Sequence, residues 1–346
     1  MKHVLLFSII WFSCFGCGRC QQVFEVRTIA FYNLENLFDT VNDTTHYDDD
    51  RTASGSGRWT KERYTRKLEN LAKVISGLGG SRRAAHPDIL GVCEVENREV
   101  LQDLIEQPLL QSANYAYIHA DSPDERGIDV ALIYDQEHFI PTTYHFQKVR
   151  LYDERFHRDK TRDQLIVVGY LDGEEMGYIV NHWPSRRGGT QKSEANRIRA
   201  ALVTRQLMDS LRHEHPEMPV IIMGDFNDNP DNKSIKQVLQ TLSVKDSIGE
   251  YQLFNPMEKL YARGYGTIGY RDRWSLFDQF LLNRHAVRSR PGRFIFWKSG
   301  IYAPPYLVRS TGRYRGYPKS TYVAGKYSGG YSDHFPVYIH LIRQVD

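Results

Sequence analysis

The string GDFNDNP at 224–230 places a carboxylate and an amide two residues apart, directly after an almost fully apolar segment. Asp225 and Asn227 can therefore be directed at one atom, as a metal or phosphate site requires. Near the C-terminus, Asp333 and His334 stand side by side just before an apolar, β-branched run. For both strings the alternative interpretation is an ordinary polar turn, because Asp, Asn, Gly and Pro dominate turns.

Two further strings carry weaker signals of the same kind. CEVEN offers Glu94 as a ligand for a hard cation, with Glu96 as a rival. NHWPSRR places His182 close to Arg186 and Arg187, a combination that suits proton transfer beside a phosphate. The simpler interpretations are an exposed glutamate and a packed histidine next to a solvated basic turn. Taken singly, neither string identifies a site.

The elements that must position these side chains are short apolar runs alternating with helical patterns, which is typical of a layered α/β fold. One helix is predicted from near Thr60 to Gly79-Gly80, because apolar residues recur at helical spacing over 64–78. A second helix opens at Ser193. The predicted strands are 24–32, 88–92, 129–135, 165–171, 177–180, 219–223, 279–283 and 336–342.

The polar residues lie systematically at the ends of these strands. In a mixed sheet, the start of an antiparallel strand lies on the same edge as the ends of its neighbours. All of these side chains are therefore predicted to converge on one rim, where ligands of open α/β sheets usually bind. The residues that follow a strand are Asn33, Glu94, His182 and Asp225, and those that precede one are Asp278, Asp333 and His334.

Together, these side chains match the needs of metal-assisted phosphodiester hydrolysis. A Mg²⁺-type ion takes oxygen ligands and leaves positions for phosphate and water. In-line attack needs a base on one side of the phosphorus and an acid on the other. The charge that develops on the phosphoryl oxygens needs donors fixed in advance, such as amides, imidazoles or guanidinium groups.

The composition fits a single large globular domain. The 346 residues are 41% hydrophobic, 25% charged and 12% aromatic. The net charge is only +3, so any preference for a polyanion must come from local basic clusters. We read residues 23–346 as one domain, because no linker-like segment divides them. No run in this mature chain approaches the 18 or more apolar residues of a transmembrane segment.

Residues 1–22 have the layout of a secretory signal peptide: a basic start, an apolar run of about a dozen residues, then small residues. FGC, ending at Cys17, loosely resembles a lipoprotein processing box, so a lipid anchor is the alternative to cleavage before QQ. The mature chain keeps only Cys93 and cannot form an internal disulfide. Export without disulfides favours a bacterial envelope protein, in the periplasm or as an outer-membrane lipoprotein, or a secreted protein.

The ordered strings YNLEN, GVCEVEN, NHWPSRRGG, GDFND, LFDQFLL and YSDHFPV resemble the endonuclease/exonuclease/phosphatase superfamily, and more narrowly its exported bacterial branch of extracellular endonuclease-like proteins. The similarity covers roughly residues 24–345. It implies a four-layer α/β sandwich, in which two mixed β-sheets pack face to face with helices on the outside, as in deoxyribonuclease. The resemblance says less about the substrate, because members of the superfamily keep one active site and differ in the loops around it.

The same resemblance implies roles for the metal-side residues. Glu94 would be the main ligand of Mg²⁺, or of Mn²⁺, with Asn33 beside it and Asp333 as a second carboxylate. A structural Ca²⁺ is a further possibility. The chain departs from the common pattern at Cys93, where a Gln often precedes the glutamate, and this removes a candidate hydrogen bond behind the metal. Glu96 remains the rival ligand.

For the catalytic residues, the resemblance implies that Asp225 and Asn227 orient the water and stabilise the pentacoordinate phosphorus. His334, oriented by Asp278, would act as base or as phosphate-binding imidazolium, and His182 as general acid; which imidazole plays which part stays open. The remaining candidates are Arg186 and Arg187 for phosphate binding and, more weakly, Asp129 as a support for His182, and Arg162.

Basic and aromatic residues interleave in the segment 306–331, directly upstream of Asp333, and cationic loops at 156–164 and 185–199 add to them. Lysine and arginine pair with phosphates and tyrosine stacks on bases, so nucleic acid is the favoured substrate of a monomeric, exported endonuclease. Two alternatives remain: a phosphodiesterase or phosphatase acting on lipid or sugar phosphates, and a catalytically silent envelope binding protein with the same fold.

Overall fold

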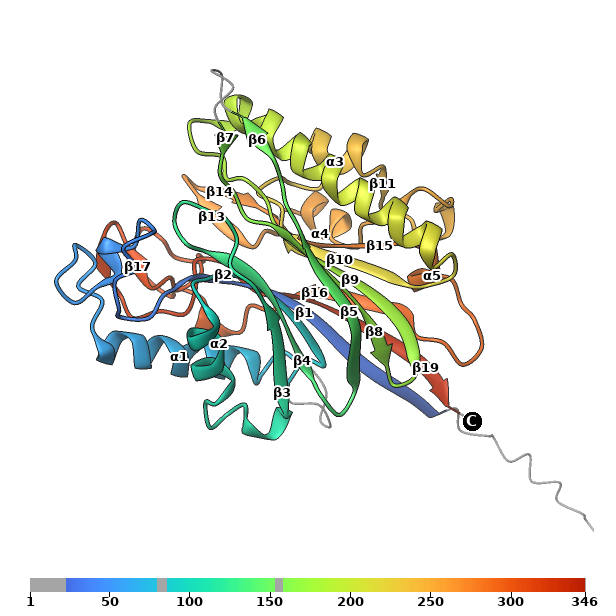
Figure 1. Ribbon diagram of the computed structural model, residues 1–346, viewed down its shortest axis with the longest axis horizontal. Coiled ribbons are helices and arrows are strands. Elements are labelled where there is room, and N and C mark those ends of the chain that lie inside the picture. Colours follow the sequence, from blue (N-terminus) through green and yellow to red (C-terminus); the bar gives the residue numbers. More distant parts are fainter. Residues whose placement is uncertain (1–22, 80–85, 153–157, 346) are drawn as a thin grey trace, which may run out of the picture.

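The computed structural model describes residues 23–79, 86–152 and 158–345, so the predicted signal peptide lies outside the described residues. Two mixed sheets form its centre (Figure 1). The first has the order β16 (Ile295–Ile301), β19 (Val337–Val345), β1 (Val23–Leu37), β2 (Ile89–Val95), β4 (Asp129–Asp135), β3 (Tyr115–His119). The second has the order β11 (Thr241–Leu242), β12 (Leu253–Phe254), β15 (Asp278–Leu282), β10 (Val220–Asp225), β9 (Glu174–His182), β8 (Gln164–Leu171), β5 (Phe139–Gln147).

The two sheets pack face to face around a continuous apolar core. Phe31 from the first sheet lies in this core with Met223 and Phe280 from the second. Along β10 the side chains alternate: Ile221 and Met223 face the other sheet, and Val220 and Ile222 face the opposite side. Because β10 is buried on both faces, its sequence is apolar throughout rather than alternating.

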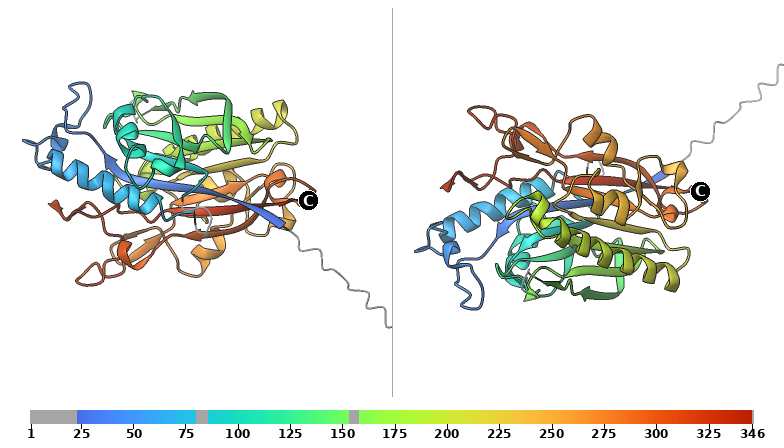
Figure 2. Two further views of the ribbon diagram at one scale, coloured as in Figure 1. Left: turned by 90° about the horizontal axis from the view of Figure 1, so that it is seen from below. Right: turned by 90° about the horizontal axis from the view of Figure 1, so that it is seen from above.

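Helices cover the two outer faces (Figures 1 and 2). The apolar sides of α1 (Lys61–Ile75) and α2 (Arg98–Ile105) pack on the first sheet, and that of α3 (Thr190–Glu214) packs on the second. The four-layer sandwich predicted from the strings is therefore confirmed. The shorter elements are α4 (Glu258–Ala262), α5 (Arg284–Val287) and the two-stranded pairs β6 (Leu151–Tyr152) with β7 (Arg158–Asp159), β13 (Ile268–Tyr270) with β14 (Arg273–Ser275), and β17 (Tyr322–Val323) with β18 (Lys326–Tyr327).

Several predicted boundaries differ from the structure: β1, β2 and β9 extend beyond the predicted strands, and two helices differ as follows. Helix α1 ends at Ile75, and turns rather than helix lead on toward Gly79. Helix α3 begins at Thr190, three residues before the predicted start at Ser193. The prediction missed this first turn because its sequence, TQK, has no apolar residue to reveal the helical period. Strand β5 was not predicted either: it lies at a sheet edge and most of its residues are at least partly exposed.

Strand directions bring the polar ends together as expected. β1 is parallel to β2, and β9 is parallel to β10, so their C-terminal ends share an edge. β15 runs antiparallel to β10 and begins at that edge. In this register Asp225 pairs with His182 on one side and with Asp278 on the other. Among the described residues, no helix is long and apolar enough to cross a membrane.

Candidate active site

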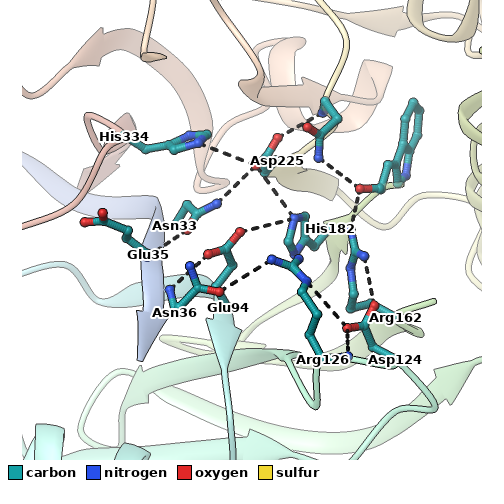
Figure 3. Close-up of polar contacts among 12 residues, drawn as sticks. Asn33, Glu35, Asn36, Glu94, Asp124, Arg126, Arg162, His182, Asp225 and His334 are labelled. Atoms are coloured by element: carbon teal, nitrogen blue, oxygen red, sulfur yellow. Dashed lines mark hydrogen bonds and ion pairs between the residues drawn. The ribbon is translucent and has the colours of Figure 1, made fainter. Parts of the chain in front are cut away.

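Asp225 lies at the centre of the rim, between two imidazoles (Figure 3). Its Oδ2 accepts a hydrogen bond from Asn33 Nδ2 at 3.1 Å. The same oxygen lies 3.8 Å from His182 Nε2 and 3.9 Å from His334 Nε2. Asp225 is only 2% exposed, and burial raises the pKa of its carboxyl to about 6. The structure thus brings together four of the predicted residues around one oxygen atom.

His334 is fixed from two sides. Its Nδ1 lies 2.7 Å from Asp278 Oδ2, and its backbone N–H donates to Ser332 Oγ at 3.0 Å. Ser332 in turn donates to the backbone carbonyl of Asn33 at 2.7 Å, which ties the turn before β19 to β1. Burial alone would lower the pKa of His334, but Asp278, with Asp225 and Asp333, outweighs it and raises that pKa well above its usual value. Nε2 is left facing the centre.

His182 has the opposite electrostatic setting. Burial, reinforced by the positive charges of Arg162 and Arg126, lowers the pKa of its imidazole well below the usual value. Its Nδ1 is buried without a hydrogen-bond partner among the described residues, while Nε2 faces Glu94 Oε1 at 3.8 Å. The site therefore holds one imidazole that favours its neutral form and one that favours its charged form.

Glu94 reaches the rim through a β-bulge. The pairing of β2 with β4 shifts register between Cys93 and Val95, and Glu94 has a φ of 62°, in the left-handed region. Its Oε2 accepts from the backbone N–H of Asn36 at 2.9 Å. Asn36 and Glu35 also have positive φ, at 52° and 51°. Such strained backbone conformations concentrate at functional sites, and they are what the sequence could not reveal.

Asn227, also in the left-handed region with a φ of 50°, closes the turn after β10. Its backbone N–H donates to Asp225 Oδ1 at 2.9 Å, and its Nδ2 donates to the backbone carbonyl of Trp183 at 2.9 Å. Arg162 donates to that same carbonyl at 2.6 Å and to Asp124 at 2.9 Å. The amide of Asn227 is thus held in place beside Asp225, and Arg162 supports it from behind.

The two predicted phosphate-binding arginines are placed differently. Arg186 donates to the Asn227 carbonyl at 2.9 Å and to Asp228 at 3.1 Å, and its guanidinium lies over the Phe277 ring. Through these contacts Arg186 stabilises the turn after β10. Arg187 lines an open cavity next to His182 instead.

Two weaker candidates lie outside the centre. Asp129, expected to support His182, instead accepts from the Ser122 backbone at 2.7 Å and pairs with His119 at 3.1 Å; the difference follows from the turn at 122–128, which brings Ser122 onto it. Glu96 lies just after β2, accepts from the backbone N–H of Asp39 at 2.6 Å and lines a separate cavity together with Asp39. Burial raises the pKa of Glu96 to about 8.

A buried lysine near the site lies in none of the motifs that the sequence analysis identified. Lys67 of α1 is 1% exposed and donates to Thr321 Oγ1 at 2.7 Å and to the Tyr331 carbonyl at 2.6 Å. Its Nζ lies 3.7 Å from Glu35 Oε2, which accepts from the Thr321 backbone. Lys67 occupies a position on the apolar face of α1, and a charge at such a position is the signal that could have identified it.

The donor set fits a divalent cation. Glu94 Oε1 and Asp225 Oδ2 each lie 3.8 Å from Nε2 of His182, beyond hydrogen-bonding distance, so two carboxylates face one imidazole that favours its neutral form. Burial raises the pKa of Asp333 to about 7, and the charges of Glu35 and Glu94 add to the effect, while those of His334 and Lys67 oppose it, so acids are crowded here. Glu94 and Asn33 would hold the ion, which would supply charge stabilisation and a polarised water.

Two cavities flank this centre. One, of about 770 Å³, lies on the His182 side and is lined by basic residues that include Arg126, Lys160, Arg162 and Arg187. The other, of about 360 Å³, reaches Asp333 and is lined by tyrosines and arginines, namely Tyr270, Tyr314, Tyr317, Tyr322, Arg271, Arg309 and Arg313. The segments 38–60 and 306–331 meet at this end of the molecule, where Tyr322 donates to the Gly57 carbonyl at 2.8 Å (Figure 2).

The two-sheet sandwich and its rim of acids, amides and imidazoles define a phosphoester hydrolase. A family model described as "Endonuclease/Exonuclease/phosphatase family" matches residues 28–343, and the chain belongs to that family. All three activities in the family's name hydrolyse phosphoester bonds. No curated protein matches the chain.

Solved structures share the fold at low identity. A family protein from Bacteroides thetaiotaomicron is 19% identical, with a TM-score of 0.55 over 93% of this chain and 96% of that one. The mannosyl-6-phosphatase Bt3783 of the same organism is 19% identical, with a TM-score of 0.53 over 91% and 99%. D. rerio TDP2 complexed with a single-strand DNA product is 15% identical, with a TM-score of 0.53 over 91% and 98%.

Proposed function

We propose that this protein is an exported, divalent-metal-dependent phosphodiesterase, and specifically an endonuclease that hydrolyses DNA, RNA or both by in-line attack of water. The observation that supports it most strongly is a pair of open, cationic cavities that reach different sides of the site, one lined by Arg162 and Arg126 and the other by Asp333. A chain of phosphodiesters needs room and positive charge on both sides of the bond that is cut, whereas a terminal phosphate needs them on one side. Mg²⁺ or Mn²⁺ is the proposed ion, by analogy with the family.

The residues divide the chemistry between them. Asp225 Oδ2, close to both Nε2 atoms, takes the proton of the attacking water. The Asn227 amide and the imidazolium of His334 donate to phosphoryl oxygens and stabilise the charge that develops there. The bond from phosphorus to the leaving oxygen breaks as the bond from the water oxygen forms, and the leaving oxygen receives a proton from the solvent or from an imidazole of the site. Asp278 holds His334 in the required orientation.

The cavity that reaches Asp333 supports a nucleic-acid substrate over a sugar phosphate. Tyr270 and Tyr314 are 68% and 37% exposed, and Arg271 and Arg313 lie over their rings. Aromatic faces with adjacent guanidinium groups can stack on bases while pairing with phosphates. A sugar phosphate would instead need a ring of hydroxyl-directed polar groups.

The test compares substrates. Purified wild-type protein and Asp225→Asn are incubated with supercoiled plasmid, single-stranded DNA, RNA and a panel of sugar and lipid phosphates, with Mg²⁺ or Mn²⁺. We expect nicked and linear DNA or shortened RNA from wild type only. Phosphate release from the panel without nucleic-acid cleavage would instead assign the alternative phosphatase function, and inactivity on every substrate would support a silent binding protein.

The leader predicted over 1–22 supports export to a bacterial envelope or beyond it, and Cys17 is the proposed lipidation point if the chain is a lipoprotein. We expect a monomer. Mass spectrometry of the mature N-terminus distinguishes a free glutamine from a lipid-modified cysteine, and detection of an intact leader in the cytoplasm would contradict export.

A further inference from the structure

A third cavity, separate from the two that flank Asp225, is strongly acidic. Its volume is about 200 Å³, and it lies between the loop after β1, the end of β2 and the β3–β4 connection. The carboxylates that line it come from all three segments, and the basic side chains that line it are those of Arg126 and His46. The acids are Asp39, Asp43, Asp48, Glu96, Asp121 and Asp129.

Asp48 gives independent evidence for a ligand. It lines the cavity but is only 2% exposed, and its Oδ1 has no hydrogen-bond partner among the described residues. Its other oxygen, Oδ2, accepts from the backbone N–H of Asp43 at 2.9 Å. A buried carboxylate oxygen without a donor is costly, so it calls for a cation or ordered water.

The protein's own cations do not balance this charge. Arg126 extends toward Asn36 at 3.5 Å and Asp124 at 3.9 Å, and so serves the catalytic rim (Figure 3). His46 is bound to Asp43 at 2.6 Å. On the other wall, His119, Asp121 and Asp129 offer ligand atoms within 4.8 Å of one another. On the β2 side, the charges of Asp39, Asp48 and Asp43 add to burial in raising the pKa of Glu96, so the carboxylates of the loop after β1 are crowded against it.

We propose that this cavity binds a structural Ca²⁺ ion, with Asp48 and Asp121 among its ligands. Calcium takes six to eight oxygen ligands in flexible geometry, which suits carboxylates supplied by loops from separate segments. Mg²⁺ demands a stricter octahedron, and the scarcity of nitrogen or sulfur donors disfavours zinc. The bound ion joins the loop after β1 to the loops that follow β2 and β3. It thereby stabilises the backbone from which Asn36 and Glu94 enter the active site.

The test separates this site from the catalytic one. Ca²⁺ binding is measured by calorimetry, and thermal unfolding is followed with and without Ca²⁺, for wild type, Asp48→Asn, Asp121→Asn and the catalytic variant Asp225→Asn. Asp121 is exposed, so its substitution is not expected to impair folding. Asp246→Asn, an exposed acid elsewhere, is the matched control.

We expect Ca²⁺ at a hundred times its Kd to raise the Tm of wild type, Asp225→Asn and Asp246→Asn by about 5 °C. Asp48→Asn should lose this shift, and Asp121→Asn should weaken binding about tenfold. Unchanged binding in both cavity variants would overturn the proposal, as would the loss of all Ca²⁺ binding in Asp225→Asn or the absence of binding in wild type. None of these results depends on whether nucleic acid is cleaved.

Discussion

His334 Nδ1 lies 2.7 Å from Asp278 Oδ2, although the two residues are 56 positions apart. Asp278 is the first residue of β15 and stands in register with Asp225 of β10. The carboxylate that orients the imidazole and the carboxylate that faces its other nitrogen are therefore fixed by adjacent strands. This row from Asp278 through His334 to Asp225 leads to the first prediction.

Removing His334 should lower kcat/KM by about 10²–10⁴-fold, the range for one acid–base or charge-stabilising group. Asp278→Asn should cost less, about 10–100-fold, because it acts by orienting His334. The double variant should be no slower than His334→Ala alone, since both changes remove one function. Steady-state kinetics of all three variants check this; additive losses would show that Asp278 acts independently of His334.

Lys67 and Glu35 should be coupled in stability. Lys67→Ala leaves the partly buried Glu35 carboxylate without its ion-pair partner and is expected to lower the free energy of unfolding by about 3 kcal/mol. Adding Glu35→Gln should recover part of that loss. Urea denaturation measures both, with Lys61→Ala, an exposed lysine of the same helix, as the control. An equal loss in the double variant would contradict the coupling.

His340 should make stability depend on pH. Burial, aided by Lys298, lowers the pKa of this imidazole to about 4 in the folded protein, against about 6.5 when unfolded. Between these values the unfolded chain binds more protons, so stability falls as pH drops from about 6.5 to 4. Allowing for solvent screening, the loss is about 2 kcal/mol.

His340→Gln should remove this part of the acid sensitivity while leaving other carboxylates to titrate. The difference between the two urea-denaturation curves, measured at pH 7.5 and at pH 4.5, isolates the contribution of His340. Equal acid sensitivity in wild type and variant would show that this imidazole is not held in its neutral form.

The tyrosine-arginine cavity should govern binding rather than chemistry. Tyr314→Ala and Arg313→Ala are expected to raise KM for single-stranded DNA several-fold, since one stacked base contributes about 1–3 kcal/mol, with little change in kcat. Arg313→Ala should also reduce the slope of log KM against log salt by about 0.7, the value for one lost phosphate contact on a single strand. Unchanged KM and salt slope would exclude this cavity as part of the substrate path.

The strings predicted the site's centre because catalytic side chains must stand at strand ends, and strand ends are visible as the borders of apolar runs. Asp225, His182 and His334 follow from that rule. What the strings missed depends on backbone conformation: Asn36 and the bulge at Glu94 require left-handed residues that leave no periodic mark. Arg186 was expected to contact phosphate, but a guanidinium serves equally well to hold a turn, and only the contacts reveal which.

The central claim is that a metal-dependent phosphodiesterase site is built around Asp225. Its most direct test is the initial rate of plasmid nicking by wild type, Asp225→Asn and Glu94→Gln, each with Mg²⁺ and with EDTA, using Asp246→Asn as the matched control. With Mg²⁺, we predict rapid nicking by wild type and the control, and rates at least about 10²-fold lower for both site variants. With EDTA, we predict no nicking by any of the four proteins. Undiminished nicking by Asp225→Asn, or nicking that persists in EDTA, would contradict the account.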